Sequence, residues 1–128
     1  MILDSSVIVS ITLREPGHEE LVNKLRSAET LGIGAPSLTE AGMVLASRLG
    51  VEPQALLDRF LRDFGVVPVA FGDHHWREAL EAFRRFGKGR HPASLNFGDC
   101  LSYATARLAG HPLLFVGDDF KKTDIQAA

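Results

Sequence analysis

The sequence predicts an α/β fold in which a central parallel sheet of four to five strands is flanked by helices on both faces. Two observations lead to this prediction. Short apolar runs of strand length alternate with longer segments of helical periodicity, and glycine or polar residues separate them. Successive strands that are joined through a helix pair in parallel, which places the helices on the faces of the sheet. The length of 128 residues suits one domain, residues 1–128.

Four strands are expected from the apolar runs. They cover residues 2–3, 31–35, 66–70 and 113–116. The third contains Pro68, which has no backbone N–H to donate, so we expect this strand at an edge of the sheet. A fifth strand near Ile125 has little chain left to form it.

Six segments repeat apolar residues three and four positions apart, as amphipathic helices do. They begin near Ser5, Leu21, Leu38, Leu57, Trp76 and Leu101. Gly50 and Gly65 follow two of these segments and predict helix ends, because glycine readily adopts the left-handed conformation found there. Residues 87–94 are expected to form a loop.

Composition excludes several classes of protein. Hydrophobic residues make up 45% of the chain, as in ordinary globular proteins, and the net charge of -2 excludes a molecule that is basic all over. The one cysteine, Cys100, allows no intramolecular disulfide, and we expect it to be a core thiol. No apolar stretch approaches the roughly 20 residues of a membrane span. We therefore expect a cytoplasmic protein without a membrane partner.

Acidic residues recur where a predicted strand ends or a predicted helix begins. They are Asp4, Glu40, Asp99 and the pair Asp118 and Asp119. The carboxyl ends of parallel strands meet at one crevice, so these side chains should converge there. Carboxylates that are gathered in this way repel one another unless a cation neutralises them. Because hard oxygen ligands suit Mg²⁺ or Mn²⁺, the sequence predicts an acidic metal site.

Each acid also has a purely structural interpretation. Glu40 with Ser37, and Asp99 with Asn96, have the spacing of a capping box at a helix start. Asp4 is placed to cap the helix that follows it, and residues 117–119 suit a turn. Four independent caps need not lie on the same edge of the sheet, whereas a metal site requires its acids to lie there. We therefore favour a metal site. The two roles are also compatible at a helix amino end.

The sequence resembles the PIN-domain ribonucleases of the VapC toxin family over nearly its whole length. The segments that carry the resemblance are Met1 to Ser6, Thr39-Glu40, Asn96 to Ala104 and 113–125. The basic loop 87–91 also resembles a loop of one VapC subgroup. The resemblance implies a PIN-like fold and a metal-dependent endoribonuclease that acts as the toxin of a type II toxin–antitoxin system.

The resemblance also implies which acids are catalytic. Asp4 and Asp99 would hold Mg²⁺, or Mn²⁺, directly or through water, and Glu40 and a fourth acid would complete the site. Many PIN domains place the fourth acid three residues before a phenylalanine, but Gly117 occupies that position here. In the VapC subgroup that the chain resembles, the aspartate stands directly before the phenylalanine, so Asp119 is favoured and Asp118 remains an alternative. The ion would activate water for in-line attack on an RNA phosphodiester.

Other residues are candidates for substrate binding. Ser5 and Ser6 are placed to orient a water or a phosphate, although helix capping is an equal alternative. Lys88, Arg90 and His91 form the densest basic cluster, and we expect them to contact the RNA backbone.

The resemblance implies two protein partners. One is a VapB-type antitoxin that inserts a segment into the acidic cleft. The other is a second copy of the chain, in a homodimer that uses helices of the amino-terminal half. The alternative function is a catalytically idle PIN-like module that binds RNA or protein. The full set of acids argues against that alternative.

Overall fold

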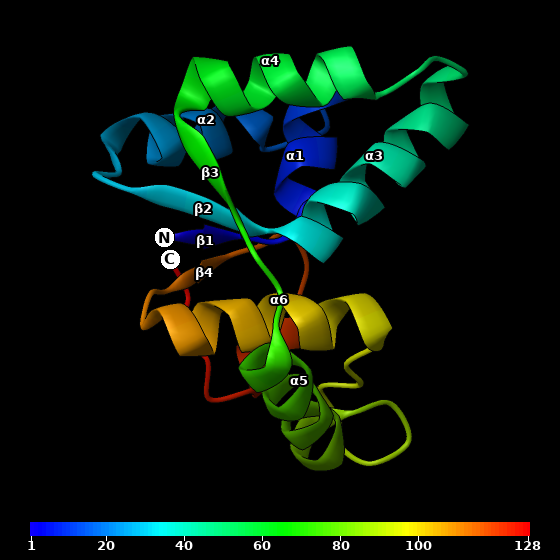
Figure 1. The fold of residues 1–128 in the computed structure, drawn as a ribbon, viewed down its shortest axis with the longest axis vertical. Coiled ribbons are helices and arrows are strands. Elements are labelled where there is room, and N and C mark those ends of the chain that lie inside the picture. Colours follow the sequence, from blue (N-terminus) through cyan, green and yellow to red (C-terminus); the bar gives the residue numbers. More distant parts are fainter.

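Four parallel strands form the sheet of this protein, as the sequence predicts. The computed structural model describes all residues from Met1 to Ala128. The strands are β1 (Ile2–Leu3), β2 (Leu31–Gly34), β3 (Val66–Val69) and β4 (Leu113–Leu114). Their order in the sheet is β3-β2-β1-β4 (Figure 1).

Helices cover both faces of this sheet. They are α1 (Ser5–Thr12), α2 (His18–Ser27), α3 (Ala35–Leu49), α4 (Gln54–Phe64), α5 (Asp73–Phe86) and α6 (Phe97–Ala109), followed by the 3-10 helix η1 (Asp119–Lys122). Figure 1 shows α1 to α4 on one side of the sheet and α5 and α6 on the other. No helix has both the length and the hydropathy required to span a bilayer.

β1 and its neighbour at the sheet edge, β4, contribute residues to separate cores on the two faces. Ile2 and Leu113 are paired in register and belong to the core that contains α5 and α6. Leu3 and Leu114 are the next pair and belong to the core that contains α1, α3 and α4. Successive residues of a strand point to opposite faces, so strands of only two residues each anchor both cores.

Strand details differ from the prediction at the carboxyl-terminal end. No fifth strand forms near Ile125, and this segment makes only an isolated bridge between Leu113 and Ala127. β4 ends at Leu114, so Phe115 and Val116 leave the sheet earlier than predicted. The edge position of the proline-containing strand is confirmed, because β3 pairs only with β2.

Helix boundaries confirm four of the predicted start and stop signals and contradict one. Asp4 caps α1, Asn96 and Asp99 form a capping box on α6, and Gly50 and Gly65 follow α3 and α4 in the left-handed conformation. The capping box expected from Ser37 and Glu40 is wrong. α3 begins at Ala35, directly after β2, so both residues lie inside the helix.

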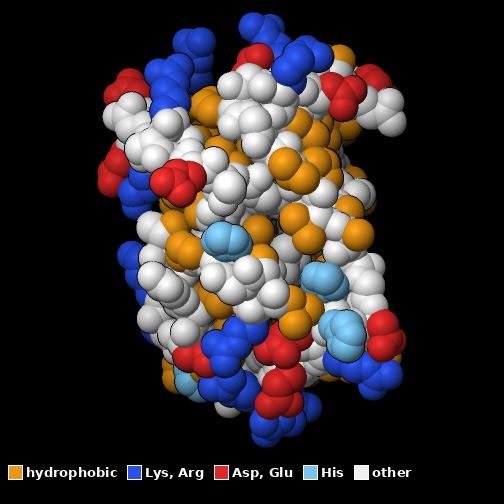
Figure 2. Space-filling view, turned by 60° about the vertical axis from the view of Figure 1, so that its left-hand side comes forward, with side chains coloured by type: hydrophobic (Ala, Val, Ile, Leu, Met, Phe, Trp, Pro, Cys, Tyr) orange, Lys and Arg blue, Asp and Glu red, His pale blue; other side chains and the backbone are white.

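Charged side chains are unevenly distributed over the surface. Figure 2 shows hydrophobic side chains reaching the surface in the middle of the molecule, whereas Lys, Arg, Asp and Glu gather towards its two ends. Charges of both signs lie at each end, in keeping with the net charge of -2.

Candidate active site

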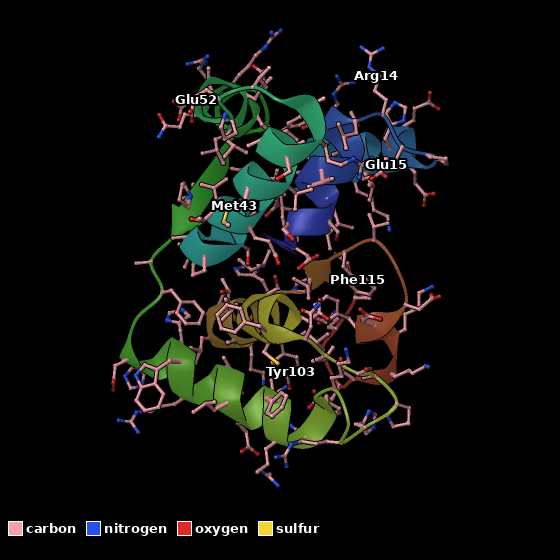
Figure 3. All side chains as sticks on the ribbon, turned by 90° about the vertical axis from the view of Figure 1, so that its right-hand side faces the viewer. Arg14, Glu15, Met43, Glu52, Tyr103 and Phe115 are labelled. Atoms are coloured by element: carbon pink, nitrogen blue, oxygen red, sulfur yellow. The ribbon has the colours of Figure 1, made fainter.

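Four of the predicted acids meet at the carboxyl edge of the sheet. Asp4 directly follows β1, Glu40 lies in the second turn of α3, Asp99 lies in the first turn of α6, and Asp119 begins η1. Figure 3 shows this edge, with α6 seen nearly end-on below α1 and α3. We call these four residues the acidic cluster. The negative charges of the other three all act to raise the pKa of Asp99, which places Asp99 at its centre.

Asp4 is buried and is held by three hydrogen bonds. Its Oδ2 accepts from the backbone N of Ser6 at 3.1 Å and from Ser6 Oγ at 2.6 Å. Its Oδ1 accepts from Ser102 Oγ at 2.6 Å. The Ser6 hydroxyl also accepts from the backbone N of Val116 at 3.0 Å, so it ties α1 to the segment after β4. These donors stabilise a carboxylate in one orientation.

Glu40 is positioned by α1 and by a close approach to α6. Ser5 Oγ donates to Glu40 Oε1 at 2.6 Å. The other oxygen, Oε2, lies where a Cβ on Gly98 would approach it to 2.4 Å. A larger residue at position 98 would therefore displace the Glu40 carboxylate from this position beside α6.

Asp99 combines the role of a cap with an unfavourable electrostatic environment. Its Oδ2 accepts from the backbone N of Asn96 at 3.1 Å. Burial raises the pKa of Asp99 from 3.8 to about 6, and the charges of Asp4, Asp119 and Glu40 add to this rise. The Asn96 hydrogen bond opposes the rise in pKa without cancelling it. A carboxyl group in this state is stabilised as an anion by any nearby cation.

The two neighbouring aspartates after β4 have different surroundings. Asp118 is exposed and forms an ion pair with Lys121 at 2.7 Å, and the hydrogen bond from Lys121 lowers the pKa of Asp118. Asp119 has no such partner, and its charge reaches Asp99. Of the two alternatives, Asp119 is the one whose charge acts on Asp99, whereas Asp118 pairs with a lysine of the 3-10 helix that follows it.

The acidic cluster fits a hydrated Mg²⁺ better than an ion enclosed by protein ligands. No three Asp, Glu, His or Cys side chains are arranged to ligate one ion together. Mg²⁺ ordinarily keeps several waters and takes only one or two carboxylates. No protein donor reaches Asp99 Oδ1 or Glu40 Oε2, so both oxygens are available to a cation or its waters.

The predicted basic loop contains side chains with different environments. Lys88 is exposed, and no ion pair involves it. The Arg90 guanidinium lies 5.1 Å from the ring centre of Phe83. His91 packs edge-on against Phe86 at 5.1 Å, and its Nδ1 accepts from the backbone N of Ala93 at 3.0 Å. His91 is therefore engaged in holding the loop.

Two serines near the acidic cluster were not among the predicted site residues. Ser102 Oγ donates to Asp4, and Ser37 Oγ lies 3.1 Å from Ser102 Oγ. The sequence carried a signal for both. Ser102 lies three residues after Asp99 and Ser37 lies three residues before Glu40, and this spacing puts each hydroxyl on the helix face of its acid. Gly98, within the segment Asn96 to Ala104, also shapes the site, because its lack of a side chain leaves room for the Glu40 carboxylate.

Cys100 takes no part in the chemistry of this site. It is buried in the core beside α5, and burial raises the pKa of its thiol to about 11. A thiol with so high a pKa is not a nucleophile at neutral pH. The predicted role as a core thiol is confirmed.

One groove borders the acidic cluster, and a second lies between α3 and α4. The first, which we call the aromatic groove, has a volume of about 850 Å³ and runs from Glu40 past Met43, Phe71 and Phe97. A hollow of about 380 Å³ continues it along α5 and α6. Its walls are entirely apolar, and it shares Trp76, Phe97 and Leu101 with the first part. The exposed fraction of Phe97 is 81%, which is unusual for a large aromatic side chain.

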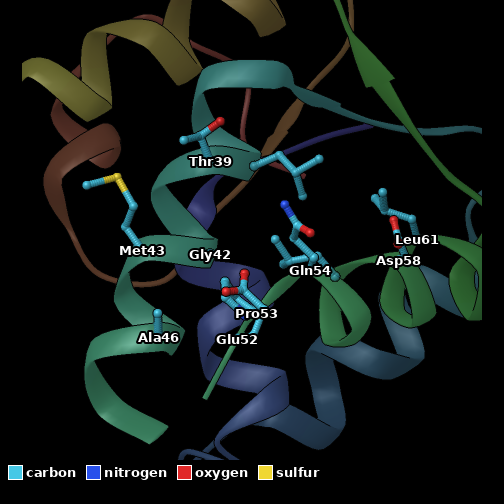
Figure 4. A pocket seen from close by; sticks show the side chains of 11 residues that line it. Thr39, Gly42, Met43, Ala46, Glu52, Pro53, Gln54, Asp58 and Leu61 are labelled. Carbon is cyan, nitrogen blue, oxygen red and sulfur yellow. The ribbon is translucent and has the colours of Figure 1, made fainter. Parts of the chain in front are cut away.

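The second groove, the α3–α4 groove, has a volume of about 630 Å³ and a different character. Figure 4 shows Thr39, Gly42 and Ala46 of α3 facing residues of α4 across it. Its lining combines apolar side chains with the carboxylates of Glu52 and Asp58.

This fold is that of the PIN-domain class, and the profile of the PIN domain matches residues 1–126. The chain is 41% identical over 129 residues to Ribonuclease VapC42 of Mycobacterium tuberculosis, which covers 100% of this chain and 98% of the relative. The chain belongs to the VapC family of PIN-domain proteins.

Solved structures agree with this assignment at the level of the fold. The crystal structure of Mycobacterium tuberculosis VapC20, described as a Sarcin-Ricin loop cleaving toxin, matches with a TM-score of 0.79 and 16% identity. The match covers 99% of this chain and 97% of VapC20. A chain of a toxin–antitoxin complex from Klebsiella pneumoniae matches with a TM-score of 0.71 and 16% identity, over 96% of this chain and 92% of the other.

Proposed function

We propose that this chain is a Mg²⁺-dependent endoribonuclease and the toxin of a type II toxin–antitoxin pair. The observation that carries the proposal is the meeting of the acidic cluster at one edge of the sheet, with Asp99 at its centre. The relatives supply the substrate class, because VapC42 is named a ribonuclease. Mn²⁺ is the alternative ion, since it accepts the same hard oxygen ligands.

Each acidic residue has a separate role in the proposed hydrolysis. Asp4 and Asp99 hold the ion, directly or through water. When bound, the ion supplies Lewis acidity and lowers the pKa of a water for attack on the phosphodiester. Glu40, anchored by Ser5, presents its Oε2 to the same space. Asp119 completes the negative field, and Asp118 has no catalytic role because Lys121 neutralises it.

The serines have assigned partners in this scheme. Ser5 donates to Glu40 and Ser6 donates to Asp4, so both orient carboxylates instead of binding the substrate phosphate. Lys88 and Arg90 remain our candidates for contact with the RNA backbone, because both are exposed and cationic. His91 is withdrawn from that set, since its ring packs against Phe86.

The two grooves differ in chemistry, and we assign them to different partners. The α3–α4 groove carries Glu52 and Asp58, so a second copy of this acidic surface would meet like charges there. A basic amphipathic segment suits it better, and we assign it to a VapB-type antitoxin whose chain then continues to the acidic cluster. The toxin–antitoxin complex from Klebsiella pneumoniae, which shares this fold, supports a partner of that kind.

The aromatic groove suits a second copy of the chain. Its walls are formed by large apolar side chains and almost no charge, which is the composition of the buried centre of a homodimer interface. Met43, Leu80 and Phe97 are exposed by 68%, 60% and 81%. An apolar surface of this kind is rarely left in contact with water. The proposed homodimer therefore uses α3 together with α5 and α6.

A nuclease assay tests the proposed activity directly. Purified protein is incubated with RNA and Mg²⁺, with RNA and a chelator, and as the Asp99→Asn variant with RNA and Mg²⁺. We expect cleavage only in the first reaction, with 5′-phosphate and 3′-hydroxyl ends. An idle PIN-like binding module would bind RNA or a protein without cleaving RNA under any of these conditions. RNA cleavage that persists in the chelator would exclude the metal mechanism.

A further inference from the structure

A chain of serine hydroxyls leads from the interior of the molecule to Asp4. We propose that Ser102 and Ser37 are positioning residues that, together with the contacts from Ser6, leave Asp4 a single lone pair, on Oδ1, with which to bind the metal ion or its water. The proposal rests on the proposed function, because it concerns the same acidic cluster. It assigns a role to two serines for which the mechanism above has no use.

These hydroxyls are completely enclosed by protein. The exposed fractions are 0% for Ser102, 2% for Ser37 and 6% for Asp4. Ser37 Oγ lies 3.1 Å from Ser102 Oγ, and Ser102 Oγ lies 2.6 Å from Asp4 Oδ1. Buried hydroxyls without partners are costly, so side chains of this kind are retained in a core only with their hydrogen bonds satisfied.

The donor-to-acceptor direction of these serine hydrogen bonds follows from counting the hydroxyl hydrogens. A serine hydroxyl has one hydrogen to donate and can also accept. Ser102 donates its hydrogen to Asp4, so it can only accept from Ser37. Ser6 likewise donates to Asp4 and accepts from the backbone N of Val116. Each of the two hydroxyls that donate to Asp4 therefore also accepts a hydrogen bond from a further donor.

The same count shows which lone pairs of the Asp4 carboxylate remain free. An ionised carboxylate offers about four lone-pair directions, two on each oxygen. Oδ2 uses both, because it accepts from the backbone N and the Oγ of Ser6. Oδ1 uses one, for Ser102. One direction on Oδ1 remains, so Asp4 binds a cation through one oxygen and cannot chelate it with two.

This restriction favours Mg²⁺ over larger ions. Ca²⁺ commonly takes both oxygens of a carboxylate and tolerates flexible geometry, whereas Mg²⁺ requires near-octahedral directions and few protein ligands. Groups behind a ligand that fix its orientation typically contribute 10- to 100-fold to metal affinity or activity. Ser102 acts directly on Asp4, and Ser37 acts through Ser102, so the effect of Ser37 should be smaller.

The test compares metal binding among three serine-to-alanine variants, and it needs no RNA. Mg²⁺ and Ca²⁺ are titrated separately into the parent, Ser102→Ala, Ser37→Ala and the control Ser10→Ala, by calorimetry. Ser10 is buried to the same degree, with an exposed fraction of 1%, but it lies in the second half of α1 and makes no hydrogen bond to the acidic cluster. Thermal unfolding of each variant shows whether it is folded.

We expect Ser102→Ala to bind Mg²⁺ roughly 10-fold more weakly. Ca²⁺ affinity should fall less, so that the ratio of Mg²⁺ to Ca²⁺ affinity decreases. Ser37→Ala should change the ratio in the same direction by a smaller factor, and Ser10→Ala should not change it. A Ser102→Thr variant keeps the hydroxyl and should restore the ratio. If Ser102→Ala does not fold, the same decrease in Ser37→Ala carries the test.

Two failures are distinguishable. Folded Ser102→Ala and Ser37→Ala variants with the parental ratio of affinities would overturn the positioning role and leave the metal site intact. A parent that binds neither Mg²⁺ nor Mn²⁺ would overturn the metal site, and this inference with it. An equal fall in Mg²⁺ and Ca²⁺ affinity in all three alanine variants, the Ser10→Ala control included, would show a general loss of stability and would also overturn the positioning role.

Discussion

Asp99 shows how a single residue can serve both the fold and the site at a cost in stability. It closes the capping box of α6, and its carboxylate must also stay ionised next to three other acids. Burial and these charges raise its pKa to about 6, so the metal-free folded protein holds a proton that the unfolded chain releases. The unfolding free energy should therefore fall as pH rises from about 4 to 6, and stay lower above that range.

Asp99→Asn should remove this pH dependence and keep the cap, because the amide oxygen can still accept from the Asn96 N–H. In a chelator at pH 7.5 we expect the variant to be more stable than the parent by about 1–2 kcal/mol, a figure reduced to allow for solvent screening. Urea unfolding at pH 4 and pH 7.5 measures the difference, which should be smaller at pH 4. An equal gain at both pH values would contradict the pKa argument.

Mg²⁺ binding should depend on pH for the same reason. Below pH 6 the ion must displace the proton on Asp99, so its affinity should rise with pH and level off above that value. Calorimetry of the parent between pH 5 and pH 8 measures this, and proton release should accompany binding at the lower end. A flat profile across pH 6 would mean that Asp99 does not ligate the ion.

Asp118 and Asp119 offer a matched comparison between neighbouring aspartates. Asp119→Asn should lower RNA cleavage strongly, because its charge reaches Asp99. Asp118→Asn should leave cleavage within about 2-fold of the parent, because it removes only an exposed ion pair with Lys121. Single-turnover cleavage rates decide between them. A larger loss in Asp118→Asn would show that the alternative assignment of the fourth acid is correct.

At the scale of single elements, the basic loop between α5 and α6 contains two candidate RNA-binding residues, Lys88 and Arg90, and one residue that packs against Phe86, His91. Replacing Lys88 and Arg90 together by alanine should weaken RNA binding and reduce the slope of log affinity against log salt by roughly 0.7 for each lost phosphate contact. Mg²⁺ affinity should not change, because neither side chain can ligate a cation. RNA titrations at several salt concentrations measure the slope.

His91→Ala is the control within the same loop. It removes the contact with Phe86 and the acceptor for the Ala93 N–H, so we expect a loss of unfolding free energy with the salt slope unchanged. A double alanine variant that kept the parental salt slope would place the RNA path elsewhere.

At the scale of the whole molecule, the aromatic groove is our proposed homodimer interface. Leu80→Glu places a charge in this groove and should convert a dimer into a monomer, seen by light scattering as a fall from twice the chain mass to 14.0 kDa. Val67→Glu is the matched control, since Val67 is equally exposed but lies on the edge strand β3, away from the groove. A parent that is monomeric, or a dimer that Leu80→Glu leaves intact, would reject this interface.

Much of the fold followed from local signals in the sequence. The alternation of apolar runs and helical stripes determined the parallel sheet, and Pro68 determined which strand lies at an edge, because each depends on backbone chemistry that is local in the chain. The capping box expected from Ser37 and Glu40 was wrong because spacing alone cannot show where a helix begins. α3 starts at Ala35, and both side chains have distant partners instead.

The sequence by itself determined the class of fold and, apart from the choice between Asp118 and Asp119, the residues that form the acidic cluster, since carboxylates at strand ends and helix starts are brought to one edge by the topology of a parallel sheet. Only the tertiary structure decided which side chains contact them. Ser102 meets Asp4 across 98 residues, and Ser5 meets Glu40 across 35. Contacts over such separations depend on how α1, α3 and α6 pack against one another. No local pattern of residues records that packing, so the positioning of each carboxylate became visible only in the folded molecule.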